Sequence, residues 1–292
     1  MNKQIEPLNV ASWVACAPAE QQGFREAVHI VLSAIGGSVA LRTQMVMKGG
    51  MLMALRYNST RFTRDADFST TQLYQQGKEK ELTEELEIQI QYFNQVLSYN
   101  THCTIQTASM SPPGPNRTHP TLKLTIGYAA PSNPAAMRRL FAKQSSKILE
   151  IDFSYNEAVL DIEMLRLSDA EELHVYSLAN LMAEKYRSLL QQPLRRRNRY
   201  QDVYDLYFLI RKVALSSLQE QAHLLECIKA TCNSKNIAAQ RNSLNNPDVQ
   251  RMAAEGYITL ENDLSEKLPD FESAYGMVSE FYKNLPWHES EN

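Results

Sequence analysis

Residues 48–69 read KGGMLMALRYNSTRFTRDADFS and contain the turn, helix and strand signals around which the rest of the chain is organised. The apolar residues 45–47 that precede this stretch are typical of a buried strand, and residues 51–55 are good helix formers. Residues 58–60, Asn-Ser-Thr, favour a turn, and residues 65–69 alternate as a strand does. We therefore expect a strand, a glycine pair, a helix, a turn and a second strand.

Asp65 and Asp67 lie two residues apart in the second of these strands. Successive side chains of a strand point to opposite faces, so both carboxylates lie on one face while Ala66 and Phe68 point to the core. Neighbouring carboxylates repel each other unless a cation lies between them, and Mg²⁺ prefers oxygen ligands. We expect two Mg²⁺ ions here, holding the attacking and leaving oxygens of a phosphoryl displacement. The alternative, true of most Asp-x-Asp triplets, is a surface turn or helix cap.

Lys48, Gly49 and Gly50 stand between the predicted strand and helix. The free N–H groups at the start of a helix favour a phosphate, and glycine lets the backbone approach an anion closely. We therefore predict that these three residues bind the phosphates of a nucleotide. The alternative is a simple turn, but a glycine pair so close before Asp65 and Asp67 favours the phosphate site.

Asp152 is the third candidate acid and lies inside the predicted strand KILEIDFSY, residues 147–155. Its neighbours Ile151 and Phe153 suggest a buried carboxylate, which is costly unless it is paired or bound to a metal. We expect Asp152 to be a third metal ligand that also takes the proton of the incoming hydroxyl. An acid exposed to water at the edge of the sheet is the alternative.

The second half of the chain has a different pattern. Strands predicted at residues 103–108 and 121–128 belong to the first half, whereas long helical runs follow one another from residue 177 onward. These runs are residues 177–191, 199–213 and 218–231, followed by a weaker set to residue 282. We predict an α+β protein with a mixed-sheet domain over residues 1–170 and a helical domain over residues 171–292.

Lys185, Asp202 and Asp205 are the candidate functional residues of the helical half. A lysine can meet a triphosphate as a point charge. Asp202 and Asp205 lie one turn apart, and an acid pair in the first turn of a helix is also explained by the helix dipole. The pattern leaves open which of the two acids is functional.

The composition is that of an ordinary globular protein, with 43% hydrophobic and 22% charged residues and a formal net charge of −3. Any nucleic-acid site must therefore be a local basic patch. The four cysteines show no metal-ligand spacing, and the first residues lack the apolar run of a signal peptide. No apolar stretch reaches the roughly 20 residues of a membrane span. We expect a cytoplasmic protein with free thiols and no membrane partner.

Together these residues resemble the AbiEii/AbiGii toxin family, within the polymerase-beta-like nucleotidyltransferase superfamily. The resemblance covers three segments in the family's order, which are residues 48–69, LEIDFS at residues 149–154, and LANLMAEKYRSLLQQPLRRRNRYQDVYDLYFL at residues 178–209. The superfamily's glycine-serine is Gly49-Gly50 in this chain, as is usual for the family. The chain also has Ala66 where a larger apolar residue is common, and Gln201 where a basic residue often precedes the aspartate.

The resemblance implies that Asp65 and Asp67 bind metal, that Asp152 is the third carboxylate, and that Lys185 and Asp202 serve the nucleotide. It also implies a toxin of a type IV toxin–antitoxin or phage-defence pair, with an antitoxin protein as partner. Some relatives add nucleotides to the 3′ end of tRNA and so stop translation.

The acceptor is less well indicated by the sequence. The densest basic cluster could bind tRNA or another RNA, since basic residues neutralise phosphates whatever the base sequence. It consists of Arg195, Arg196, Arg197 and Arg199. A solvated loop between helices is the alternative. Two other functions stay open, which are nucleotide transfer to a protein or small molecule and a non-catalytic nucleotide-binding regulator.

Overall fold

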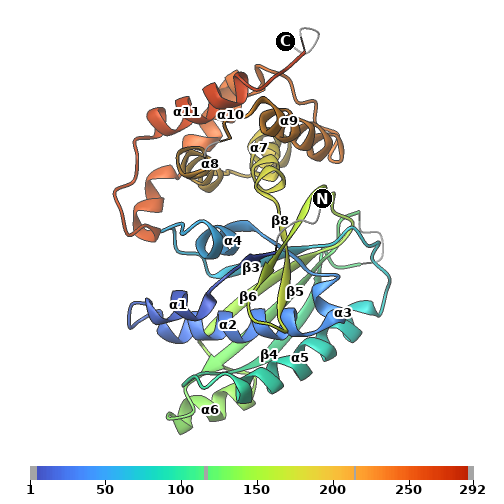
Figure 1. The fold of residues 1–292 in the computed structure, drawn as a ribbon, viewed down its shortest axis with the longest axis vertical. Helices are drawn as coiled ribbons and strands as arrows, with labels where there is room; N and C mark the ends of the chain where they lie inside the picture. Colours follow the sequence, from blue (N-terminus) through green and yellow to red (C-terminus); the bar gives the residue numbers. More distant parts are fainter. Residues whose placement is uncertain (1–4, 115–117, 214, 289–292) are drawn as a thin grey trace. The chain divides into compact units, whose positions relative to one another are not determined.

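An eight-stranded mixed sheet forms the centre of the first of two compact units in the computed structural model, which describes residues 5–114, 118–213 and 215–288 (Figure 1). The first unit consists of Met1–Arg56 and Thr63–Val175, and the second of Tyr57–Phe62 and Tyr176–Asn292. The predicted fold class, a mixed sheet followed by a helical region, is confirmed.

The strands follow the order β1-β7-β8-β2-β3-β6-β5-β4 across the sheet. In chain order they are β1 (Glu6–Pro7), β2 (Val46–Lys48), β3 (Asp65–Ser69), β4 (His102–Ser111), β5 (Thr121–Ala129), β6 (Ile148–Ser154), β7 (Ile162–Arg166) and β8 (Glu172–Tyr176). Strand β3 pairs antiparallel with β2 and parallel with β6, and β6 pairs antiparallel with β5. Segments far apart in the sequence therefore meet in the middle of the sheet.

The described part of the first unit contains six helices. They are α1 (Val10–Ala15), α2 (Gln22–Gly37), α3 (Val39–Arg42), α4 (Gly49–Arg56), α5 (Lys78–Val96) and α6 (Pro134–Phe141). Of these, α2, α4, α5 and α6 contact strands of the sheet, whereas α1 packs on α2 and α3 packs on α2 and α5. The helices α2 and α5 lie side by side along the sheet, and α2 contacts β4, β5 and β6 (Figure 1). Because α2 is covered by both the sheet and α5, Ile30, Leu32 and Ile35 are completely buried.

The second unit is helical, apart from its short boundary segments. It contains α7 (Leu178–Arg195), α8 (Tyr200–Lys212), α9 (Leu218–Asn233), α10 (Pro247–Ala254), α11 (Phe271–Lys283) and the 3₁₀ helices η1 (Ser243–Asn245) and η2 (Tyr257–Asp263). The α7 helix packs against α8, α9 and α10, and α8 packs against α11. Ser177 caps α7 by accepting a hydrogen bond from the Asn180 N–H, and Ser217 and Glu220 form a capping box on α9.

Two observations bear on the expectations about thiols and membranes. Cys16, Cys103, Cys227 and Cys232 form no disulfide, as expected. Within the described ranges, no helix combines the length and the apolar character needed to cross a membrane.

Candidate active site

Strand β3 places Asp65 and Asp67 on one face of the sheet. Ala66 and Phe68 are 1% and 0% exposed, whereas Asp65 is exposed and Asp67 is half-buried. The alternation predicted from the sequence is therefore present. The Asp65 carboxylate accepts a hydrogen bond from the Thr63 hydroxyl.

The pairing of β3 with β6 extends this acidic face. Asp67 is the direct partner of Asp152, and Asp65 is the direct partner of Glu150. Direct partners on neighbouring strands lie on the same face, and neighbouring strands are about 4.8 Å apart. Four carboxylates, two on each strand, therefore share one face, which we call the carboxylate face.

The expectation that Asp152 is buried was wrong. Ile151 and Phe153 take the core side of β6 and are both 0% exposed, so alternation turns Asp152 to the other face, where its side chain is 37% exposed. Its Oδ2 accepts from Lys123 Nζ at 3.1 Å. Nor does Asp152 lie at a sheet edge, since β6 is an interior strand between β3 and β5.

Gly49 begins α4 directly beside Asp67. Its φ of +73° is in the left-handed region, and a Cβ added at Gly49 would overlap Asp67 Oδ2 and lie 3.0 Å from Asp67 Cγ. Lys48 is buried and is the direct β2 partner of Asp67. The predicted order of strand, glycine pair and helix is therefore present, and only glycine leaves room there for the Asp67 carboxylate.

The carboxylate face suits Mg²⁺ by its donor chemistry. Hard oxygen donors are the ligands that Mg²⁺ prefers, and the ion is commonly held by one or two carboxylates together with waters and substrate phosphates. Across the described part of the chain, no group of three or more His, Cys, Asp or Glu side chains has the geometry to hold a metal ion. Mg²⁺ does not require such a closed protein cage.

The second unit contains a buried ionic cluster. Lys185 Nζ donates to Asp205 Oδ2 at 2.6 Å and to Asp202 Oδ1 at 3.3 Å. Arg61 donates to both oxygens of Asp205, from Nε at 2.9 Å and from the terminal Nη2 at 3.0 Å. We call Arg61, Lys185, Asp202 and Asp205 the ionic cluster. It joins the segment 57–62 to α7 and α8.

Electrostatics hold this cluster in its charged form. Burial alone lowers the pKa of Lys185, but the charges of Asp205 and Asp202 outweigh burial and the pKa is raised. Burial alone raises the pKa of Asp205, but Arg61 and Lys185 outweigh it and the pKa is lowered. Both groups are therefore ionised at neutral pH.

The two acids of α8 differ in their surroundings. The Asp205 side chain is 1% exposed and forms ion pairs with Arg61 and Lys185, whereas the Asp202 side chain is 13% exposed and, within the ionic cluster, pairs with Lys185. Asp205 thus has the environment of a residue that holds the helices together. Asp202 has some access to solvent and hence to a ligand.

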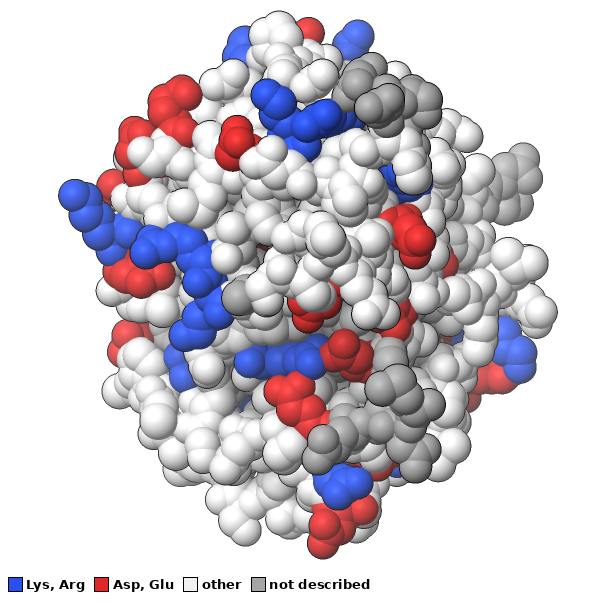
Figure 2. Space-filling view, turned by 45° about the horizontal axis from the view of Figure 1, so that its top comes forward, with Lys and Arg blue, Asp and Glu red and all other residues white. Residues whose placement is uncertain are grey.

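The predicted basic cluster is only partly at the surface. Arg195, Arg196 and Arg197 are exposed, whereas Arg199 is half-buried and burial lowers its pKa. Arg195 ends α7, and the left-handed Arg196 follows as its C-cap. On the face drawn in Figure 2, Lys and Arg side chains are interspersed with Asp and Glu.

The family profile described as "Nucleotidyl transferase AbiEii toxin, Type IV TA system" matches residues 31–277, which include both the carboxylate face and the ionic cluster. The chain belongs to the AbiEii family. A member of this family is a nucleotidyltransferase toxin of a type IV toxin–antitoxin system, which implies a nucleoside triphosphate as substrate and a cognate antitoxin. No curated protein matched in a sequence comparison.

Solved structures support the fold of this AbiEii-family chain. It is similar to a protein of Helicobacter pylori proposed to be a nucleotidyltransferase, with 11% identity, a TM-score of 0.51, and coverage of 92% of this chain and 96% of the other. It is also similar to JHP933 from Helicobacter pylori, with 13% identity, a TM-score of 0.54, and coverage of 92% of both chains. At such low identity the likeness concerns the fold alone.

Three polar residues of the AbiEii-family chain were missed by the sequence reasoning, namely Glu150, Lys123 and Arg61. Glu150 had a usable signal, because Glu150 and Asp152 are two residues apart in a strand just as Asp65 and Asp67 are. Lys123 and Arg61 had none, since their partners lie far away in the sequence.

Proposed function

We propose that this chain transfers a nucleoside monophosphate from a nucleoside triphosphate to an acceptor hydroxyl, with the carboxylate face as the catalytic centre. The observation that carries the proposal is the pairing of Asp67 with Asp152 beside Asp65 on one sheet face. The left-handed Gly49 at the start of α4 supports it, because its backbone lies against the Asp67 carboxylate.

Magnesium is the metal that we propose for this face, as two ions, with Asp65 and Asp67 as ligands and Asp152 as the third carboxylate. When bound, the ions would neutralise charge on the phosphates and on the attacking and leaving oxygens. Lys48, Gly49 and Gly50 would contribute a cation and backbone N–H groups for the phosphates.

The protein's own side chains carry out the proton transfer of the reaction. The acceptor oxygen attacks the α-phosphorus, the bond from that phosphorus to the bridging oxygen breaks, and pyrophosphate leaves. Asp152 accepts the proton of the acceptor hydroxyl. Lys123, bound to Asp152 Oδ2, orients the carboxylate so that its other oxygen is available for that proton.

Lys185 and Asp202 are proposed to serve the nucleotide from the ionic cluster. An ammonium group has three donors, and Lys185 donates hydrogen bonds to Asp202 and Asp205. The third can bind a phosphate oxygen. Of the two acids, we assign the nucleotide role to Asp202, because its side chain has more access to solvent.

The acceptor that we propose is the 3′ end of tRNA, whose modification would stop translation and would suit a toxin or a phage-defence role. The exposed side chains of Arg195, Arg196 and Arg197 support an RNA acceptor, because they can neutralise backbone phosphates. A second exposed basic group lies on and after α6, at Arg138, Arg139, Lys143 and Lys147.

The test is incubation of the pure protein with each labelled nucleoside triphosphate, Mg²⁺ and total RNA. We expect label on RNA of tRNA size, and none with Asp67→Ala. Label on the protein would replace RNA by a protein acceptor, and no label on any component would remove the catalytic proposal. Transfer that survives Asp67→Ala would contradict the role of the carboxylate face.

A further inference from the structure

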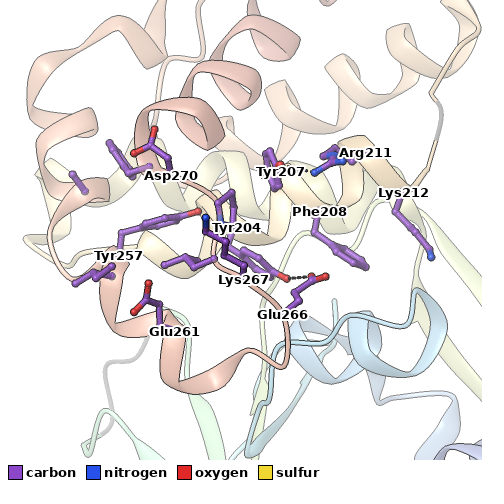
Figure 3. A pocket seen from close by; sticks show the side chains of 15 residues that line it. Tyr204, Tyr207, Phe208, Arg211, Lys212, Tyr257, Glu261, Glu266, Lys267 and Asp270 are labelled. Atoms are coloured by element: carbon purple, nitrogen blue, oxygen red, sulfur yellow. Dashed lines mark hydrogen bonds between the residues drawn. The ribbon is translucent and has the colours of Figure 1, made fainter.

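A pocket of about 940 Å³ lies wholly within the second unit, outside the groups used above (Figure 3). It is bounded by α8, by η2, by the connection after η2, and by the start of α11. Its volume is within the range of about 300–1,000 Å³ that is usual for small-molecule sites. The pocket is therefore large enough for a nucleotide.

Aromatic rings form much of its wall. Tyr204, Tyr207 and Phe208 share one face of α8, since they are three and four residues apart, and Tyr257 and Phe271 add two further rings. Phe208 is half-exposed, and its ring is stacked on that of Tyr204 with 6.4 Å between the ring centroids. A nucleobase stacks on such half-exposed rings whatever its identity, because every base has a π face.

Cations lie at the same end of α8 as the exposed rings. Arg211 and Lys212 are both exposed, and Arg211 is held by a 2.6 Å hydrogen bond to the Tyr207 hydroxyl. Two of the acidic side chains that line the pocket already accept hydrogen bonds from neighbouring groups. Glu266 accepts from Tyr204 at 2.9 Å and from Thr60 at 3.0 Å, and Asp270 caps α11. Arg211 and Lys212 are therefore placed to meet a phosphate.

The Tyr257 hydroxyl is an independent sign of a ligand. Tyr257 is 3% exposed, and among the residues that the structure describes its hydroxyl has no hydrogen-bond partner. Figure 3 shows the side chain reaching from η2 toward Tyr204, among the other lining residues. A buried hydroxyl without a partner is costly, so a polar atom of a ligand would satisfy it. Burial raises its pKa, which keeps it protonated as a donor.

The pocket adjoins the ionic cluster through a shared segment. Thr60 binds Glu266 in the pocket wall, and the next residue, Arg61, binds Asp205 of the cluster. On α8, Tyr204 of the wall likewise precedes Asp205. A ligand in the pocket would therefore lie next to the ionic cluster, to which we assign a role in binding the substrate nucleotide.

We propose that this pocket binds a second nucleotide, with its base stacked on Phe208 and Tyr207 and its phosphate on Arg211 and Lys212. The inference rests on the proposed function, in which the second nucleotide belongs to the RNA acceptor. A free mononucleotide has the same chemistry, and the test separates these two sources.

The test measures binding without turnover. A 5′-labelled single-stranded oligoribonucleotide is titrated by fluorescence anisotropy and AMP by calorimetry, both in an Asp65→Ala/Asp67→Ala background. Phe208→Ala should weaken binding about 5- to 150-fold, since base stacking is worth about 1–3 kcal/mol. Arg211→Ala should also reduce the salt dependence of oligoribonucleotide binding, measured as the slope of log affinity against log salt concentration, by about the amount expected for one phosphate contact.

Arg251→Ala is the matched control, because Arg251 is 66% exposed in the same unit and is absent from the lining. If Phe208→Ala weakens binding of the oligoribonucleotide alone, the occupant is a nucleotide of the RNA acceptor. If it weakens binding of AMP, the occupant is a free nucleotide. Affinities of both probes that stay within two-fold in Phe208→Ala overturn the proposal. Failure of the catalytic proposal is seen separately, as transfer that survives Asp67→Ala.

Discussion

Replacing Gly49 by alanine tests the carboxylate face at its tightest point. The backbone cost of a left-handed alanine is about 1–2 kcal/mol. In addition, the new Cβ would overlap Asp67 Oδ2 and lie 3.0 and 3.1 Å from Asp67 Cγ and Cβ. The Asp67 carboxylate must therefore move, and a misplacement of about 1 Å at a reacting group costs on the order of 100-fold in rate.

Gly77→Ala separates the backbone cost from the displacement of Asp67. Gly77 has φ +96° and no atom within 4 Å of an added Cβ, so it carries a backbone cost of the same kind without a clash. In both variants, each kcal/mol of lost folding stability should lower the melting temperature by about 2–4 °C, measured by circular dichroism. Only Gly49→Ala should lose about 100-fold or more in nucleotide transfer. Equal transfer rates in the two variants would refute the placement of Asp67.

Three further outcomes are expected. Asp67→Asn should lower transfer by on the order of 1,000-fold through the loss of charge stabilisation at the metal, with circular dichroism checking that the fold persists. In urea unfolding, Asp205→Asn should cost about 3–5 kcal/mol because it leaves the buried Lys185 and the half-buried Arg61 with too little compensating charge, whereas Asp202→Asn should cost far less. The pKa of Asp205 is lowered from its ordinary value of 3.8, so its ionised carboxylate stabilises the fold at pH values above 3.8, and that stabilisation is lost as the pH falls through the lower pKa of the folded state. Acid unfolding below about pH 4 should therefore be less steep in Asp205→Asn than in the wild type. An unchanged acid-unfolding profile would contradict the ionised cluster.

Local patterns predicted the elements of the carboxylate face. The alternation of Asp65, Ala66, Asp67 and Phe68 is a property of the strand itself, so it could be read without knowing the partners of β3. At Asp152 the two apolar neighbours predict burial, but alternation turns them to the opposite face of the strand. Asp152 is half-exposed for that reason.

Long-range contacts could not be predicted in the same way. The pairing of Asp65 with Glu150 depends on the register of two distant strands. The segment 57–62 reads as a turn, yet Phe62 N–H donates to the Asp263 carbonyl and Arg61 binds Asp205, so the segment belongs to the second unit. The pocket depends on the connection after η2, which has no periodic pattern from which its path could be inferred.

Charge balance indicates where nucleotide affinity must come from under the proposed function. The carboxylate face carries four acids, with Lys48 and Lys123 as their direct strand partners, so it has an excess of negative charge. The ionic cluster has two acids and two cations and is neutral. Neither group attracts a triphosphate by its net charge. Under the proposed function, divalent cations on the carboxylates and N–H groups at the start of α4 would supply the attraction, so tight nucleotide binding should depend on the divalent cation.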